Sequence, residues 1–173
     1  MAERDASGRS TSSDSALKAD QRGSSSREAG AALHHAIWTD EAIDLLPDAG
    51  WNDGGCGILA NALVAWVGED MAERWAVVSS GDGVAHHVVC RVGDWYLDAD
   101  GASTAPELLA RWQPLFGSDG SRLLAVTSSM LDSARILRDE PLSRRVATLL
   151  VRLLDRDAFR LSFGPPETPT AAA

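Results

Sequence analysis

Three residues of the types that act together in nucleophilic catalysis follow one another in the middle of the chain: Cys56, His87 and Asp98. A cysteine attacks as its thiolate, which forms at neutral pH beside positive charge or polarised N–H groups. A histidine takes up and returns the proton, and a carboxylate holds that histidine in the productive tautomer. The residue types and their order therefore predict a Cys-His-Asp site.

The residues around Cys56 predict that it begins a helix. Two glycines precede it, and apolar residues recur after it at helical spacing, at Ile58, Leu59, Ala62, Leu63 and Trp66. The first N–H groups of a helix lack intrahelical partners and favour an anion, so they would stabilise both a thiolate and an oxyanion. The alternative is a small buried side chain, because free cysteines are often buried.

His87 and Asp98 belong to a predicted β-hairpin. Residues 87–92 and 95–98 are the two predicted strands, and Gly93-Asp94 suits a two-residue type II′ turn between them. Val92 then pairs with Trp95, which places His87 diagonal to Asp98 and opposite Asp100.

The hairpin leaves two choices open. His86 falls on the other face, among apolar residues, and a register slip of one residue would exchange it with His87. Asp98 and Asp100 are both within reach of His87, and both also fit simple turn chemistry at the end of a strand. We take His87 and Asp98 as the site residues.

The elements around this hairpin predict an α+β domain. We expect a short helix over 40–46 ended by Pro47, the helix over 56–67, and strands over 75–78 and 123–126. Thr104 and Glu107 form a capping box that starts another helix. One or two helices follow over 129–154, with a break near Pro141. Helices followed by antiparallel strands and further helices are typical of the α+β class.

Three segments carry a resemblance to a known family. Gly55-Cys56 at a helix start, residues 87–92 (His-Val-Val-Cys-Arg-Val) and residues 95–98 (Trp-Tyr-Leu-Asp) resemble the core of papain-like cysteine enzymes. The likeness is strongest to the transglutaminase and arylamine N-acetyltransferase branch and to small bacterial and phage-associated domains, and it covers about residues 50–102. It implies a papain-like fold, with the cysteine helix packed on a small antiparallel sheet. It also implies Cys56 as nucleophile, His87 as base and Asp98 as the group that orients His87.

The sequence departs from that family in three ways. The interval from Cys56 to His87 (87 − 56 = 31 residues) is short compared with the large proteases. The tight hairpin leaves the choice between Asp98 and Asp100 open. No glutamine precedes Cys56 to complete an oxyanion hole, so Asn52 is the candidate substitute. Trp51, in the same loop, is a candidate wall of a substrate cleft.

Two classes of function follow. The first is a thiol hydrolase or acyltransferase that acts on an amide or ester of a peptide or protein, because peptide cleavage, deamidation and transamidation share one thioester. The second is an inactive binding or scaffold module of the same fold. We expect neither a cofactor nor a metal, because His34-His35 and the two cysteines match no zinc-ligand spacing.

Composition limits the partners and the compartment. The net charge of −9 argues against nucleic acid, whose phosphates need a basic surface. No long apolar run or charged leader is present, so we expect no membrane partner and a cytoplasmic location, with export by a route without such a leader as the alternative. Two cysteines do not make a disulfide framework. The oligomeric state is not indicated.

The same composition divides the chain into three parts. Residues 1–30 are rich in Ser, Gly, Ala and charge and contain almost no large apolar side chain, so we expect a disordered N-terminal tail. Residues 31–163 form the predicted folded domain. Residues 164–173, with their prolines, are predicted to be a disordered C-terminal tail.

Overall fold

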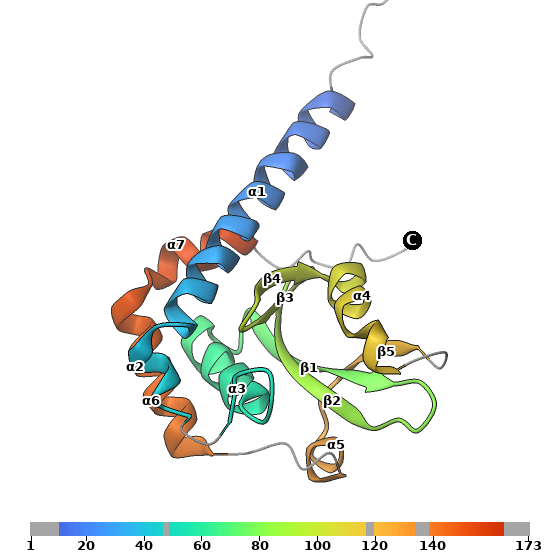
Figure 1. Cartoon of the computed structure of the whole chain (residues 1–173). Helices are drawn as coiled ribbons and strands as arrows, with labels where there is room; N and C mark the ends of the chain where they lie inside the picture. The colour runs from blue at the N-terminus through green and yellow to red at the C-terminus, as the bar shows by residue number, and fades with distance from the viewer. Residues whose placement is uncertain (1–10, 47–48, 117–119, 134–138, 165–173) are drawn as a thin grey trace, which may run out of the picture.

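The computed structural model describes residues 11–46, 49–116, 120–133 and 139–164. Within them the fold is α+β, with a five-stranded antiparallel sheet in the order β4-β3-β2-β1-β5 and helices on both of its faces (Figure 1). The strands are β1 (Ala72–Ser79), β2 (Ala85–Val92), β3 (Trp95–Asp98), β4 (Gly101–Thr104) and β5 (Ser121–Ala125). The helices are α1 (Thr11–Ile37), α2 (Asp40–Ile43), α3 (Cys56–Val67), α4 (Ala105–Phe116), α5 (Ser128–Ser133), α6 (Glu140–Leu153) and α7 (Arg156–Phe163).

Helix α3 lies in the centre of the molecule. It is apolar on almost all sides, which is typical of a helix that is covered all round. One side packs on the sheet against residues such as Cys90 and Leu97, and α1, α2, α6 and α7 cover the other side (Figure 1). This burial holds the N-terminal end of α3, and therefore Cys56, in a fixed place relative to β2.

Helix α4 covers the opposite face of the sheet. Its Leu108 is fully buried against Val77, Val89 and Tyr96, which alternate in position with the residues that face α3. The predicted capping box starts this helix, since a Glu107 carboxylate oxygen accepts the Thr104 N–H at 2.8 Å. That bond and the pairing with Arg27 of α1 lower the pKa of Glu107 to about 2.

The prediction that residues 1–30 form a disordered tail is wrong for part of that segment. Residues 11–30 belong to α1, and Ser26 and Ala29 are buried, with the Ser26 hydroxyl donating to the Ser162 carbonyl at 2.7 Å. Small side chains allow this segment to approach its neighbours closely, so the absence of large apolar residues did not prevent packing. The ordered domain therefore begins before Ala31. The predictions for residues 1–10 and 165–173 lie outside the described residues.

Most predicted elements are confirmed, and three of the described elements were missed. The helix over 56–67 and the strand over 95–98 have the predicted bounds, while the first short helix ends at Ile43 rather than near Pro47, which is itself outside the described residues. Asp139 caps α6 by accepting the Leu142 N–H at 2.8 Å, which explains the new start near Pro141. Helix α1, strand β4 and helix α7 were not predicted.

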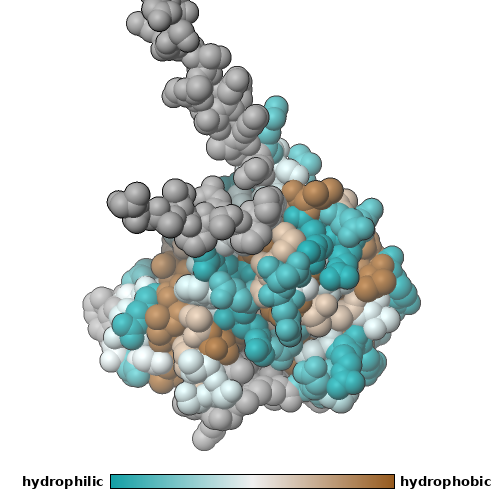
Figure 2. Space-filling view, turned by 180° about the vertical axis from the view of Figure 1, so that it is seen from behind, coloured by the Kyte–Doolittle hydropathy of each residue, from teal (hydrophilic) through white to brown (hydrophobic). Residues whose placement is uncertain are grey.

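The surface seen from behind carries apolar residues in separate groups among hydrophilic ones (Figure 2). In the part of the chain that the structure describes, no helix combines the length and the apolar character needed to cross a bilayer.

Candidate active site

A tight loop sets the start of α3. The N–H groups of Asp53 and Gly55 both donate to the Gly50 carbonyl, at 3.1 and 3.0 Å, and Gly54 has a φ of 91°. A Cβ atom at Gly55 would lie 2.3 Å from the Leu46 side chain and 2.9 Å from the Gly50 oxygen. Only glycine fits at position 55, and the positive φ of Gly54 also favours glycine. The two glycines therefore allow the loop to pack closely on Leu46 and Gly50 and fix where the helix begins.

Cys56 is buried, with 4 % of its surface exposed, among small apolar residues that include Ala76, Val78 and Val88. Burial by itself raises the pKa of its thiol. The interaction with His87 and the N–H groups of Val88 and Gly57 act in the opposite direction. Together they hold the pKa of Cys56 below its ordinary value.

The Val88 N–H is available because β3 is short. Strand β3 pairs with β2 only over Cys90–Val92, as Cys90 with Leu97 and Val92 with Trp95, which is the predicted register. Alternate residues of a strand direct their N–H groups to the same side, so Val88 directs its N–H toward the side of β3 beyond the point where β3 ends. The thiol of Cys56 interacts with this N–H group.

His87 and Asp98 form a buried pair. The Nε2 atom of His87 lies 3.0 Å from a carboxylate oxygen of Asp98, and their side chains are 0 % and 2 % exposed. Burial lowers the pKa of His87, but the interactions with Asp98 and Cys56 outweigh it, so the pKa is raised above its ordinary value. A lowered thiol pKa beside a raised imidazole pKa favours a thiolate–imidazolium pair.

The two nitrogens of His87 have different surroundings. Because Nε2 faces Asp98, Nδ1 is the nitrogen left for Cys56. Within the described residues Nδ1 makes no hydrogen bond of ordinary geometry, although the thiol is close enough for each side chain to shift the pKa of the other. Catalytic hydrogen bonds are often loose before substrate binds, so this geometry is compatible with proton transfer.

The two aspartates have different contacts. Asp98 faces His87, and its second oxygen accepts the Asp100 N–H at 3.0 Å. Asp100 instead accepts a hydrogen bond from the Asn52 side chain at 3.2 Å. The Asn52 amide, the candidate oxyanion donor, is therefore bonded to Asp100.

Two residues of α4 complete the site, and sequence reasoning missed both. The ring of Trp112 stacks on that of His87, with centroids 4.3 Å apart and planes 24° apart. Arg111 forms ion pairs with Asp98 at 2.6 Å and with Asp100 at 3.1 Å. A signal was present, since Leu108, Arg111 and Trp112 have the spacing of one helix face and an arginine is unexpected on an apolar face.

His86 does not lie where the hairpin predicted. The pairing of β1 with β2 passes from Val77–His87 directly to Val78–Ala85, so a bulge at this point disturbs the alternation of side chains. His86 is exposed rather than packed among apolar residues, and the prediction for it was wrong.

Other candidates from the sequence have structural roles. Trp51 is 2 % exposed and belongs to the main core, so the prediction that it walls a cleft is wrong. His34 hydrogen-bonds the Ala99 carbonyl through Nδ1 at 2.9 Å. Cys56 and Cys90 are both free thiols. Among the described residues, no group of three His, Cys, Asp or Glu side chains could hold a metal ion.

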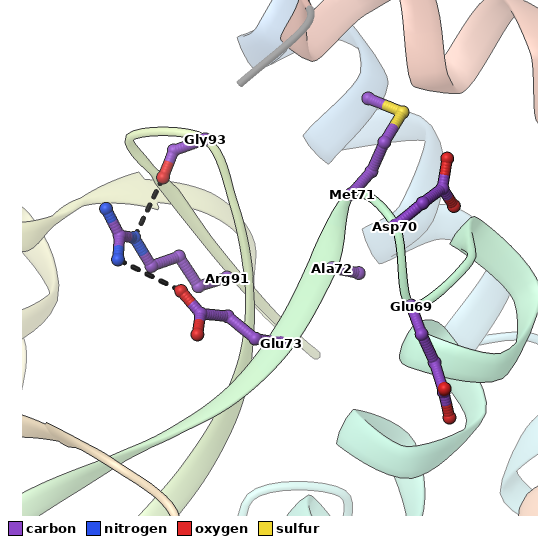
Figure 3. Close-up of a pocket in the computed structure, with 7 residues that line it drawn as sticks. All are labelled: Glu69, Asp70, Met71, Ala72, Glu73, Arg91 and Gly93. Carbon is purple, nitrogen blue, oxygen red and sulfur yellow. Dashed lines mark hydrogen bonds and ion pairs between the residues drawn. The ribbon is translucent and has the colours of Figure 1, made fainter. Parts of the chain in front are cut away.

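An open hollow of about 240 Å³ lies away from Cys56, at the C-terminal end of α3 (Figure 3). It is lined by residues 69–73, Arg91 and Gly93. Arg91 donates to the Gly93 carbonyl at 2.8 Å and to Glu73 at 3.0 Å. This lining contains neither a cysteine nor a histidine, and it includes none of Cys56, His87 and Asp98.

No protein-family model, curated protein or solved structure matches the chain. The resemblance to papain-like cysteine enzymes therefore depends on the short motifs within residues 50–102.

Proposed function

We propose that the chain is a cysteine-dependent hydrolase or acyltransferase of papain-like type, with Cys56 as nucleophile, His87 as acid and base, and Asp98 as the group that orients His87. One observation carries the proposal. A buried histidine–carboxylate pair at 3.0 Å stands beside a thiol at the start of a helix, and that thiol has a lowered pKa. Cysteines with only a packing role have raised pKa values when buried.

The reaction would take place in two steps. The Cys56 thiolate attacks the carbonyl carbon of an amide or ester, a C–S bond forms, and the carbonyl oxygen becomes an oxyanion. When the intermediate collapses, the C–N or C–O bond breaks, the His87 imidazolium gives its proton to the leaving group, and a thioester remains on Cys56. Water or an amine then attacks the thioester while His87 takes up its proton. The C–S bond breaks, Cys56 leaves as the thiolate beside the His87 imidazolium, and the acid or the transferred acyl product is released.

The N–H groups around the sulfur support this chemistry. Those of Val88 and Gly57 interact with the Cys56 thiol in the resting state. N–H groups held near a developing oxyanion are among the largest contributors to acyl-transfer rates. They offer a substitute for the glutamine that the sequence lacks before Cys56. The substrate class that the resemblance implies is a peptide or a protein.

Access to the thiol requires a change in the resting structure, because Cys56 and His87 are 4 % and 0 % exposed. Val126, which follows β5, and Met130 of α5 are partly buried and pack on the apolar group around Cys56. They are the side chains we expect to shift when a substrate binds.

The same closure favours the second candidate, an inactive binding or scaffold module that retains the buried triad for stability. In that case the thiol would be no more reactive than an ordinary buried cysteine.

The two candidates are separated by the pH dependence of iodoacetamide labelling of Cys56 and Cys90, read by mass spectrometry in the wild type and in His87→Ala. The enzyme proposal expects rapid labelling of Cys56 well below pH ~8.5, the pKa of a free thiol, and loss of that labelling without His87. Slow labelling of Cys56, or labelling that does not depend on His87, would favour the module.

A further inference from the structure

We propose that Arg111 is a positioning residue that joins the two halves of the site. It connects the carboxylate behind His87 to the loop that carries Cys56. This inference depends on the proposed function, in which the thiol and the imidazole must be held together.

The first half of this connection is the contact with Asp98. An Arg111 Nη atom donates at 2.6 Å to the same Asp98 oxygen that faces His87 Nε2 at 3.0 Å. Asp98 is 2 % exposed. An isolated carboxylate is costly at such a depth, and Arg111 supplies the compensating positive charge.

The second half runs from Arg111 to the loop before α3. The other Nη atom of Arg111 pairs with Asp100 at 3.1 Å, and the Asn52 side chain donates to Asp100 at 3.2 Å. Asn52 lies in the loop that Gly50 and Gly55 close at the start of the cysteine helix. Contacts therefore pass from His87 through Asp98, Arg111 and Asp100 to the loop of the nucleophile.

We call the contacts from Asp98 through Arg111 to Asp100 the bridge, and the shape of the arginine side chain matters for it. A guanidinium presents its donors in a rigid planar fork, so one group can bond two carboxylates in fixed directions, whereas a lysine ammonium cannot hold both in that way. The bridge also separates two aspartates that would otherwise repel each other. Arg111 pairs with Asp98 and Asp100, His87 faces Asp98, and Cys56 interacts with His87.

Helix α4 keeps Arg111 in place. Leu108, one turn earlier, is fully buried under the sheet, and Trp112, the next residue, stacks on His87. The same face of one helix thus contacts both the imidazole and its carboxylate. Removal of Arg111 would free the carboxylates while leaving the packing of α4 on the sheet intact.

Arg91 provides a matched control. Its side chain is 30 % exposed, compared with 32 % for Arg111, and it also bonds a carboxylate on the sheet. It lies at the opposite end of β2 from His87, where it bonds Glu73 and Gly93 (Figure 3). Arg91→Met therefore removes a comparable arginine without touching the proposed bridge.

The test is the pH profile of iodoacetamide labelling of Cys56 in the wild type, Arg111→Met, Arg111→Lys and Arg91→Met, with circular dichroism and thermal unfolding to show that each variant is folded. Without the bridge, Asp98 and the loop before α3 are no longer held in one arrangement, and loss of the alignment of His87 with Cys56 makes the thiolate less favourable. We expect Arg111→Met to lower the rate at pH ~6 by about tenfold, which corresponds to a rise of one unit in the thiol pKa. Arg111→Lys should recover only part of this loss, and Arg91→Met should match the wild type.

Each outcome has one meaning. A folded Arg111→Met variant that labels like the wild type would overturn the inference, and full recovery in Arg111→Lys would show that charge alone matters, which also contradicts a bridge. If the wild-type Cys56 itself labels slowly at pH ~6, the proposed function fails, and the two failures are thereby distinguished.

Asp100→Ala keeps the test decisive if Arg111→Met does not fold. Asp100 is 36 % exposed and does not contact His87, so its removal should leave the core intact while it separates Arg111 from Asn52. We expect the rate of Cys56 labelling at pH ~6 to decrease roughly two- to fivefold, because one partly exposed ion pair is lost. An unchanged profile in folded Asp100→Ala would contradict the bridge.

Discussion

The two cysteines of this chain are both buried, yet their chemistry differs. Cys56 is 4 % exposed and Cys90 is fully covered, and they pack on the same side of the sheet. The pKa of Cys56 is lowered, whereas that of Cys90 is raised, first by burial and then by the charge of Glu73. Burial alone therefore does not decide whether a thiol can ionise.

The difference lies in the polar groups that each thiol meets. Cys56 stands at the end of a helix and beyond the end of β3, where N–H groups of two elements and a histidine reach its sulfur. Cys90 lies in the middle of β2, between Arg74 of β1 and Leu97 of β3, where the backbone groups are occupied by the sheet. Backbone N–H groups at the end of a helix or strand are thus free to bond the thiol, whereas those inside a continuous sheet are already paired with neighbouring strands.

Replacement of each cysteine in turn should have the largest effect. Cys56→Ala should abolish acylation of the protein by p-nitrophenyl acetate, because the thioester cannot form, while Cys90→Ala should retain it. Intact-protein mass spectrometry measures the acyl adduct, and circular dichroism confirms the fold of both variants. An adduct of undiminished yield in Cys56→Ala would exclude Cys56 as the nucleophile.

Removal of the histidine should make the two thiols alike. Without His87, burial again dominates at Cys56 and its pKa rises, so labelling by iodoacetamide at pH ~6 should decrease at least about tenfold for each unit of that rise. The matched control is His86→Ala, which removes the exposed neighbour that does not face Asp98. Equal effects of the two substitutions would contradict the assignment of His87.

Asp98→Asn should have a smaller effect, confined to one side of the pH profile. Asp98 raises the pKa of His87, so the neutral amide lowers that pKa and the imidazolium is lost at a lower pH. We expect the rate of Cys56 labelling to decrease about three- to tenfold near neutral pH, which corresponds to a fall of about half a unit to one unit in the pKa of His87. Asp94→Asn, at the exposed hairpin turn, is the control, and it should leave the profile unchanged.

Local signals in the sequence were sufficient for the parts of the site that one element determines. The start of α3 at Cys56 followed from glycines and helical spacing, and the pairing of Val92 with Trp95 followed from the two-residue turn. These are short-range properties of the backbone, and they are enough to predict that His87 lies near Asp98.

The parts that depend on contacts between distant segments could not be derived in the same way. Arg111 and Trp112 reach the site because α4 folds back over the face of the sheet, and no local pattern gives that direction. The packing of residues 26–30 was missed because composition measures the apolar content of a segment and not its fit to a neighbour. The bulge that exposes His86 interrupts an alternation that the sequence itself does not interrupt.

The smallest expected effect concerns Cys90, and it is measured as the pH dependence of the free energy of unfolding at alkaline pH. The pKa of Cys90 is raised in the folded state, so above pH ~8.5 the unfolded chain releases a proton that the folded chain retains. The contribution of Cys90 to the free energy of unfolding should therefore fall by up to ~1.4 kcal/mol per pH unit above pH ~8.5. Urea unfolding of the wild type and of Cys90→Val between about pH 8 and pH 10 measures this slope.

Cys56→Ala is the control for that measurement, and its sign is opposite. A thiol whose pKa is lowered on folding stabilises the protein above its unfolded pKa, and this contribution is lost only as the pH falls through the folded value. Cys56→Ala should therefore leave the slope above pH ~8.5 unchanged, whereas Cys90→Val should make it shallower. If both substitutions changed the slope equally, the two thiols would ionise alike in the folded protein, and the contrast on which the proposed nucleophile depends would be lost.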